Sequence, residues 1–202
     1  MDILFLSHRL PFPANKGEKI RTFNQIKYLA ELGHRITVFS PMDSDEDINN
    51  DKAFNQLNNI TSYLFPSSSK AIRLLSGLLQ GEAMSVANFR NTNLRREFER
   101  VVTEHKFDAI VCTSSAMAQY VFESQSLQGM SSRPRLLMDF MDLDSDKWRQ
   151  YAERSRFPMS LVYDRERRLM SKYEQKAQQV FDACYFIADA EVQLFCEQLT
   201  SQ

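Results

Sequence analysis

The sequence predicts an α/β fold: a Rossmann-like, doubly wound and mostly parallel sheet of about six or seven strands, in a single domain. Three observations support this. Short apolar runs of strand length alternate with segments of helical periodicity. The runs are almost continuously apolar, as in strands that are buried on both faces. The chain has 202 residues, which suits one domain of this class.

The first forty residues predict the opening unit of such a sheet: strand, long loop, helix and strand. An apolar run ends at Ser7, the loop contains Pro11, Pro13 and Gly17, and a second apolar run begins at Ile36. The loop exceeds the usual connection of about 4–6 residues, and ligands of parallel sheets bind at this edge. Gly17 stands where the helix begins, so backbone N–H groups there can meet an anion. A turn glycine without a ligand is the alternative, and the residues alone leave both open.

The helix that follows has one apolar stripe and a clear end. Gly33 is expected as its C′ residue. Apolar residues recur at three- and four-residue spacing at Ile20, Phe23, Ile26, Leu29 and Ala30. Cations are expected at its start and on its outer face, at Lys16, Lys19, Arg21 and Lys27.

The same alternation continues to the end of the chain. Strands are expected to begin near Asp2, Arg35, Ile60, Asp108, Arg135 and Ala183, and helices are expected over 67–80, 91–105, 115–125 and 158–181. The helix over 91–105 turns Leu94, Phe98, Val101 and Val102 inward. The helix over 67–80 carries Ile72, Leu75, Leu78 and Leu79 at helical spacing, with three alternative N-cap serines at 67–69.

Polar residues follow several of the predicted strands. His8 follows the first strand, Ser114 the fourth and Asp142 the fifth. The carboxyl ends of parallel strands share one edge, so we expect Ser7, His8, Gly17, Ser114, Asp139 and Asp142 to converge there. His8 is either a contact to an acceptor or donor phosphate or a capping and packing residue.

Two stretches carry a family resemblance. FLSHRLPFPANKGEKIRTFNQIKYLAELGHRITVFS resembles the start of the glycosyltransferase family 4 N-terminal domain: strand, Pro-containing loop, Gly, then helix. MDFMDLDSDKWRQYAERSRFPMSLVYDRERRLMSKYEQKAQQVFDACYFIADAEVQLF resembles the sugar transferases associated with the PEP-CTERM/exosortase system, which make exopolysaccharide in Gram-negative bacteria. The likeness runs from Met1 to about Phe195.

The resemblance implies the N-terminal half of a GT-B enzyme. Such enzymes transfer a sugar, with retention and without metal or cofactor, from a nucleotide-sugar donor to a lipid-linked or saccharide acceptor. Their donor site lies mostly on a second domain, so residues 1–202 are expected to be the acceptor-side domain, inactive alone, with the C-terminal nucleotide-sugar domain absent from the chain. Asp142 is the candidate catalytic residue, and the candidate substrate-binding residues are Ser7, His8, Lys16, Gly17, Ser114, Asp139 and Trp148. Many family members have a basic residue where this chain has Met141.

The acidic stretch after the fifth strand has three interpretations. Asp142, Asp144, Asp146 and Glu153 have the spacing of a calcium loop, but Lys147 stands where its sharp turn needs Gly. A D-x-D metal site would need a different sheet and a metal-bound donor. We favour a strand end at which Asp142 faces an interdomain cleft.

Helix capping and stacking roles go with the favoured interpretation. Asp144 or Ser145 is expected to cap the next helix. Trp148 and Tyr151 follow on that helix, and Trp148 either packs in the core or stacks on an acceptor sugar.

Composition and charge limit the classes of partner and the compartment that we expect for this protein. With 25 Lys and Arg against 26 Asp and Glu, the net charge is −1, so nothing points to nucleic acid. Three widely spaced cysteines, without a zinc pattern, fit a reducing compartment. No apolar segment is long enough to span a bilayer, so we expect a cytoplasmic protein, with peripheral contact at the inner membrane as an option. The cations that either face anionic lipid or are simply solvated are Lys70, Arg73, Arg90, Arg95 and Arg96.

Two other functions remain open at this point. A non-catalytic Rossmann-like module would bind a nucleotide or partner, but a dinucleotide fingerprint needs three glycines in the first turn, where this chain has only Gly17. Half of a sugar-nucleotide 2-epimerase would share the two-domain architecture, and its acid and base groups are not identifiable.

Overall fold

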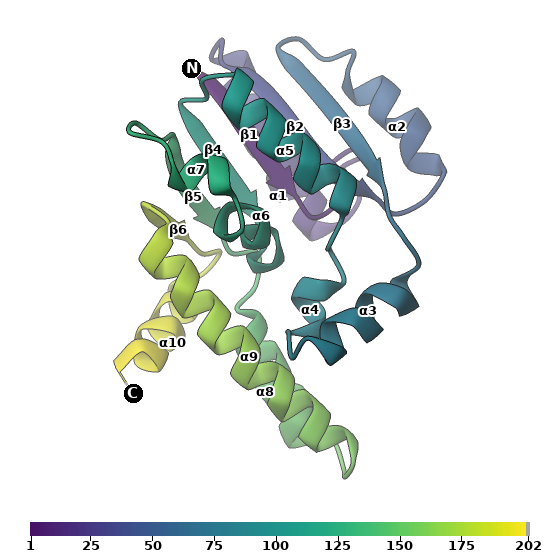
Figure 1. The fold of residues 1–202 in the computed structure, drawn as a ribbon, viewed down its shortest axis with the longest axis vertical. Coiled ribbons are helices and arrows are strands. Elements are labelled where there is room, and N and C mark those ends of the chain that lie inside the picture. The colour runs from purple at the N-terminus through teal and green to yellow at the C-terminus, as the bar shows by residue number, and fades with distance from the viewer. Residues whose placement is uncertain (201–202) are drawn as a thin grey trace.

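Six parallel strands form one sheet, in the order β3-β2-β1-β4-β5-β6, in the computed structural model, which describes residues 1–200 (Figure 1). From β1 to β3 the strands are added toward one edge of the sheet, and from β4 to β6 they are added toward the other. The strand order therefore reverses between the neighbours β1 and β4. The strands are β1 (Asp2–Ser7), β2 (Arg35–Met42), β3 (Ile60–Pro66), β4 (Ala109–Thr113), β5 (Arg135–Asp139) and β6 (Ala183–Tyr185). The α/β prediction is confirmed, and every strand begins within a residue of its expected position.

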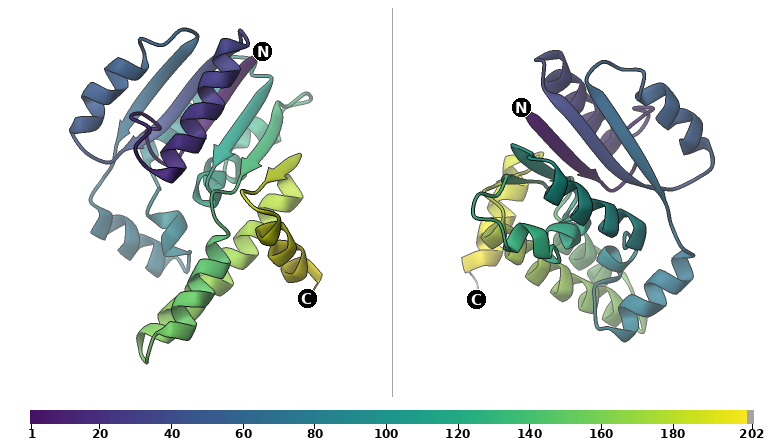
Figure 2. Two further views of the ribbon diagram at one scale, coloured as in Figure 1. Left: turned by 180° about the vertical axis from the view of Figure 1, so that it is seen from behind. Right: turned by 45° about the horizontal axis from the view of Figure 1, so that its top comes forward.

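Helices cover both faces of this sheet. Helix α1 packs on one face, and α5 and α6 on the other (Figures 1 and 2). Side chains alternate between these layers along β1, where Ile3 and Phe5 face α1 while Leu4 and Leu6 face α5. The helices are α1 (Gly17–Glu31), α2 (Glu46–Phe54), α3 (Lys70–Leu79), α4 (Met84–Ala87), α5 (Thr92–Glu104), η1 (Ser115–Met117), α6 (Ala118–Phe122), α7 (Gln125–Gln128), α8 (Asp144–Arg154), α9 (Met159–Val180) and α10 (Asp189–Thr200).

Helix α1 ends as the sequence predicts. Gly33 has φ +85°, a conformation that glycine adopts without strain. Its N–H donates to the Ala30 carbonyl at 3.0 Å, and the His34 N–H donates to the Leu29 carbonyl at 3.2 Å. These two bonds form a Schellman motif.

The structure differs from the sequence prediction in three short helices, in the division of segment 115–125 and in the cap of α8. Short α2, α4 and α7 were not expected, and the segment 115–125 divides into η1, α6 and the start of α7. Neither Asp144 nor Ser145 caps α8 through its side chain. Instead, Oε1 of Glu174 accepts the Ser145 N–H at 3.1 Å, so the cap comes from α9.

Helices α3, α4, α8 and α9 extend beyond the carboxyl edge of the sheet (Figure 1). Helices α8 and α9 form an antiparallel hairpin, and α4 packs against it through Val86, Met170 and Trp148. Helix α3 lies against α4 at Gly77, where an added Cβ would come 2.3 Å from the Ala87 Cβ. These four helices form one wall of the carboxyl edge.

None of the helices in residues 1–200 combines the length and the apolar character that crossing a bilayer requires.

Candidate functional site

A cleft of about 390 Å³ opens at the carboxyl ends of β1, β4 and β5. It lies where the strand order reverses, the place at which open α/β sheets bind ligands. Its lining comes from the loop after β1, from α3 and α4, and from the segment between β5 and α8. The lining residues that carry charge or an aromatic ring are His8, Arg9, Glu18, Lys70, Phe89, Asp142, Asp144, Lys147 and Trp148.

The strand register brings the predicted residues to this edge. Ser7 pairs with Thr113, and Thr113 pairs with Asp139, so these three strand ends lie side by side. His8, Ser114 and Asp142 follow them and line the cleft.

His8 is a buried, uncharged imidazole. Its Nδ1 lies 3.3 Å from the Thr113 carbonyl, and its ring meets Phe89 edge-on with centroids 5.6 Å apart. Burial lowers the pKa of His8 to about 4. A carbonyl only accepts, so Nδ1 carries the proton in this bond, and Nε2 is left with a free lone pair. His8 can therefore accept a hydrogen bond from a ligand at neutral pH.

Ser114 has a strained backbone at the floor of the cleft. Its φ is +80°, which is uncommon for a residue with a side chain. Its N–H donates to the Asp139 carbonyl at 2.9 Å, which holds the chain in this turn. Strain of this kind is found at functional sites, where the surrounding structure maintains it.

Asp142 offers an exposed carboxylate in the cleft, and Lys147 lines the same cleft. Asp144 also lines the cleft, but its carboxylate and that of Asp146 are engaged by neighbouring side chains. Asp144 accepts a hydrogen bond from Ser115, and Asp146 accepts from Arg149 and Gln150, each at 2.8 Å. In the described part of the chain, no three acidic, His or Cys side chains are grouped as metal ligands. This geometry supports neither the calcium loop nor the D-x-D site.

Trp148 combines packing with partial exposure to the cleft. Its Nε1 donates to the Ser85 hydroxyl at 2.9 Å, and its ring stacks on Tyr163 with centroids 5.5 Å apart. Tyr151 meets it edge-on, also at 5.5 Å. The ring is thus fixed by its partners while one part of it faces the cleft.

Asp139 and Ser7 are directed into the fold and do not line the cleft. Arg21 donates to both oxygens of Asp139, at 2.7 and 3.0 Å, and Gln25 donates to one of them at 2.7 Å. Ser7 donates to the Arg9 carbonyl at 2.6 Å. This arrangement gives Asp139 a structural role, tying α1 to the sheet edge. The expectation that Arg21 lies on the outer face of α1 is wrong for the same reason.

Gly17 and Lys16 lie at the exposed start of α1, beside the cleft. Glu18 lines the cleft and accepts a hydrogen bond from Arg9 at 2.7 Å, so the first turn of α1 reaches the same edge as Asp142. An added Cβ at Gly17 would meet nothing within 4 Å.

Two buried glutamates on α9 hold the starts of α4 and α8, two helices that line the cleft. Glu166 accepts the N–H groups of Met84 and Ser85, at 3.0 and 2.7 Å, and so fixes the start of α4. Glu174 caps α8, its second oxygen has no hydrogen-bond partner among the described residues, and burial raises its pKa to about 8. Sequence reasoning missed both. Their signal was two acids at positions 166 and 174 within the buried stripe that also contains Met170 and Ala177.

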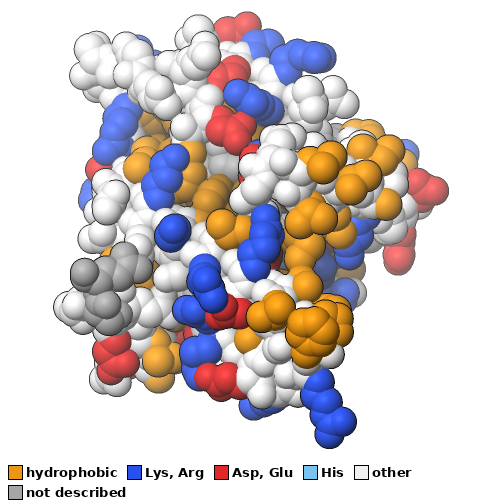
Figure 3. Space-filling view, turned by 60° about the horizontal axis from the view of Figure 1, so that its bottom comes forward, with side chains coloured by type: hydrophobic (Ala, Val, Ile, Leu, Met, Phe, Trp, Pro, Cys, Tyr) orange, Lys and Arg blue, Asp and Glu red, His pale blue; other side chains and the backbone are white. Residues whose placement is uncertain are grey.

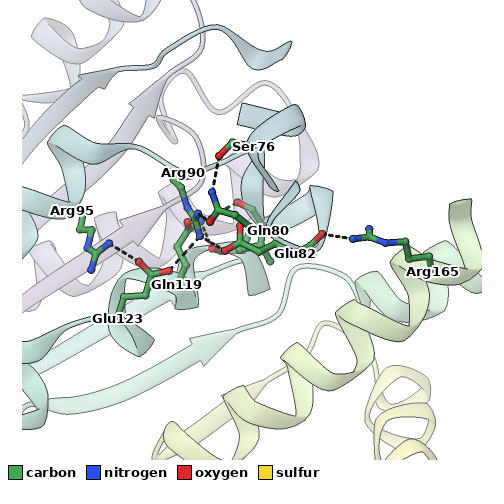
Figure 4. A network of polar contacts seen from close by, with 10 residues as sticks. Ser76, Gln80, Glu82, Arg90, Arg95, Gln119, Glu123 and Arg165 are labelled. Atoms are coloured by element: carbon green, nitrogen blue, oxygen red, sulfur yellow. Dashed lines mark hydrogen bonds and ion pairs between the residues drawn. The ribbon is translucent and has the colours of Figure 1, made fainter. Parts of the chain in front are cut away.

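A polar network joins α3, α5, α6 and α9 beside the cleft (Figure 4). Arg90 reaches Glu82 at 2.7 Å and Glu123 at 3.4 Å, and Arg95 reaches Glu123 at 3.0 Å. Arg165 donates to the Glu82 carbonyl at 3.2 Å. Arg90 and Arg95 are thus engaged within the fold.

The chain is similar to solved structures of UGT89C1 from Arabidopsis thaliana. For the complex with UDP-L-rhamnose, the TM-score is 0.47 at 9% identity, with 100% of this chain and 56% of that chain covered. For the complex with UDP, the TM-score is 0.45 at 11% identity, with 98% and 56% covered. This chain therefore spans about 56% of the length of those structures. No protein-family model and no curated protein matches the sequence.

Proposed function

We propose that this chain is the acceptor-side domain of a retaining glycosyltransferase, which moves a sugar from a nucleotide-diphosphate donor to a lipid-linked or saccharide acceptor in exopolysaccharide biosynthesis. The observation that carries the proposal is the cleft at the reversal of strand order, with His8, Ser114, Asp142 and Trp148 in its wall. The family resemblance of the sequence supports the same reaction.

The cleft residues suit the chemistry of sugar transfer. The reaction breaks the bond between the anomeric carbon and the diphosphate, joins that carbon to an acceptor hydroxyl, and releases the hydroxyl proton. Asp142 and the free Nε2 of His8 can accept a hydrogen bond from the acceptor hydroxyl. The start of α1, with Lys16 and Gly17, offers N–H groups and a cation where negative charge develops on the diphosphate. Trp148 offers part of an apolar ring to a sugar.

The donor is held mainly by a second, C-terminal domain in this proposal. The protein works in the cytoplasm, in peripheral contact with the inner membrane where a lipid-linked acceptor is found. Neither a metal nor a cofactor takes part in the proposed reaction.

The test is a transfer assay with the protein expressed from its complete open reading frame. A panel of nucleotide sugars is offered with lipid-linked and soluble saccharide acceptors, and release of the nucleoside diphosphate is followed together with the glycosylated product. We expect product with one donor, and none from residues 1–202 alone. Release of an epimerised sugar without transfer, or turnover by the isolated chain, would contradict the proposal.

Gly17→Val tests the position of the ligand. An added Cβ meets nothing within 4 Å at this exposed position, so we expect little change in the thermal midpoint, whereas an approaching ligand is obstructed. We expect transfer to fall by about tenfold or more, in line with a displaced substrate. Gly129→Ala, whose Cβ would lie at an ordinary 3.5 Å from the Gln125 carbonyl, is a control for adding a side chain at a glycine outside the cleft. Full activity of the valine variant would show that no ligand approaches there.

A further inference from the structure

An unusual apolar surface flanks the mouth of the cleft. Four apolar side chains of α3 are between 51% and 80% exposed, and at the α8–α9 turn Phe157 is 79% and Leu161 is 62% exposed. Hydrophobic side chains gather on one side of the face that holds these elements (Figure 3). We call this the α3–hairpin surface, and its apolar members are Ile72, Leu75, Leu78, Leu79, Tyr151, Phe157, Met159, Leu161 and Val162.

The outward orientation of this surface is fixed by packing. Helix α3 turns its glycine face, at Gly77, onto Ala87 of α4, so the opposite, apolar face of α3 points away from the domain. Helix α4 is anchored in turn to α9 by Glu166. The exposed side chains therefore belong to helices that are packed against the rest of the fold. Apolar surfaces of this kind mark sites that interact with a partner.

Cations surround these apolar side chains. In residues 1–200, Lys70, Arg154 and Arg156 have no carboxylate within ion-pair distance. The acids of the hairpin are neutralised by neighbours: Glu153 pairs with Arg149 at 2.8 Å, and Asp164 pairs with Arg167 at 2.8 Å and with Arg168. Blue side chains accordingly lie beside the orange ones in Figure 3.

Of the five cations singled out in the sequence, Lys70 is one of these free cations, whereas three others are engaged within the fold. Arg73 donates to the Asn88 carbonyl at 2.8 Å, and Arg90 and Arg95 belong to the network of Figure 4. These three hold the fold together. On this surface, Lys70 of α3 and Arg154 and Arg156 at the hairpin turn are the cations available to a partner.

We infer that the α3–hairpin surface docks on an anionic lipid bilayer, with its apolar side chains in the interface and its free cations at the headgroups. Lys70 and Leu74 of α3 and Lys147 and Trp148 of α8 line the cleft, so docking brings the cleft mouth to the lipid. The purpose of docking, access to a lipid-linked acceptor, rests on the proposed function. The binding itself is measured without any transfer.

The test is co-sedimentation of the chain with phosphatidylcholine vesicles, with and without a quarter of phosphatidylglycerol. The double variant Leu79→Ser/Phe157→Ser removes one apolar anchor from each half of the surface. Leu32→Ser/Tyr28→Ser is its control, because these two large apolar side chains are also more than half exposed but lie at the far end of α1. Arg154→Gln/Arg156→Gln removes the two free cations of the hairpin.

We expect the chain to bind anionic vesicles, with binding weakened by salt. The Leu79→Ser/Phe157→Ser variant should bind about tenfold more weakly or worse, since two large apolar groups no longer enter the interface. The control should bind like the parent chain. The arginine variant should lose most of the preference for anionic vesicles, by about thirtyfold, because each of the two cations contributes roughly 1 kcal/mol near the surface.

Three results would overturn the inference. These are no binding to anionic vesicles, equal loss in the control, and equal binding to neutral and anionic vesicles. A chain that instead dimerises in analytical ultracentrifugation, and becomes monomeric through Leu79→Ser/Phe157→Ser, would assign the surface to a second copy. Vesicle binding without sugar transfer in the complete protein would uphold this inference and overturn the proposed function.

Discussion

Helices α3 and α5 are both amphipathic, but the apolar face of α5 is buried and that of α3 is exposed. Each carries an apolar stripe at three- and four-residue spacing beside a polar face. The stripe of α5, including Leu94 and Phe98, is buried against the sheet, whereas that of α3, including Leu75 and Leu79, faces outward. Sequence periodicity thus predicts that a helix has an apolar face, but it does not predict which part of the protein, if any, covers that face.

The two helices are attached to the fold in different ways. Gly77 allows α3 to lie directly against Ala87 of α4, so α3 is attached by this close approach and by the Arg73 side chain rather than by its apolar side chains. Helix α5 is attached through its large side chains. The same apolar content thus stabilises the fold in one helix and is available to a partner in the other.

The largest expected difference is in stability. Leu94→Ala should lower the free energy of unfolding by about 2–5 kcal/mol, because a fully buried side chain leaves a cavity in the core. Leu75→Ala, on the outward face of α3, should change it by less than about 0.5 kcal/mol. Urea unfolding of the two variants measures both values. Similar losses would show that α3 is covered within the chain.

Helix α9 differs from both of these helices because its buried stripe contains an acidic residue, Glu174. Burial raises the pKa of this carboxyl to about 8, whereas the unfolded chain has the ordinary value near 4.5. Folding therefore takes up a proton between these pH values, and the free energy of unfolding falls as the pH rises from about 4.5 to 8. Glu174→Gln keeps an oxygen for the Ser145 N–H but cannot ionise.

The variant should therefore lose part of that pH dependence. At pH 5 the two proteins should be nearly equal in stability, and at pH 8 the variant should be more stable by on the order of a few kcal/mol. Urea unfolding from pH 5 to 9 measures this, with exposed Glu31→Gln as the matched control. Parallel curves for the variant and the parent would mean that Glu174 ionises normally.

A smaller effect is expected at the contact between α3 and α4. Gly77→Ala places a Cβ 2.3 Å from the Ala87 Cβ, so α3 must shift, at a cost of about 1–3 kcal/mol. The same substitution at Gly129 meets only ordinary contacts and should be nearly neutral. Thermal unfolding of both variants distinguishes them. A neutral Gly77→Ala would mean that α3 is not held at this contact.

The strands and α1 could be predicted because local signals determine them. Apolar runs that are buried on both faces have few alternatives, and Gly33 closes α1 through bonds that span at most five residues. Short α2 and α4 lack a long periodic pattern, so sequence reasoning missed them. The outward face of α3 could not be foreseen because its burial depends on a neighbouring helix.

The candidate site could be predicted only in outline. Parallel strands bring His8, Ser114 and Asp142 to one edge, which follows from topology. The bond between Arg21 and Asp139 joins residues 118 positions apart and has no local signal. The roles of Glu166 and Glu174 as caps likewise depend on how α9 packs against α4 and α8.

The most direct test of the account is the transfer rate of Asp142→Asn in the complete protein. The proposed site places this exposed carboxylate in the cleft, so we expect kcat to fall by about a hundredfold with an unchanged thermal midpoint. Asp45→Asn changes another exposed aspartate, which lies outside the cleft, and should retain full activity. Full activity of Asp142→Asn, or an equal loss in both variants, would contradict the assignment of this cleft as the transfer site.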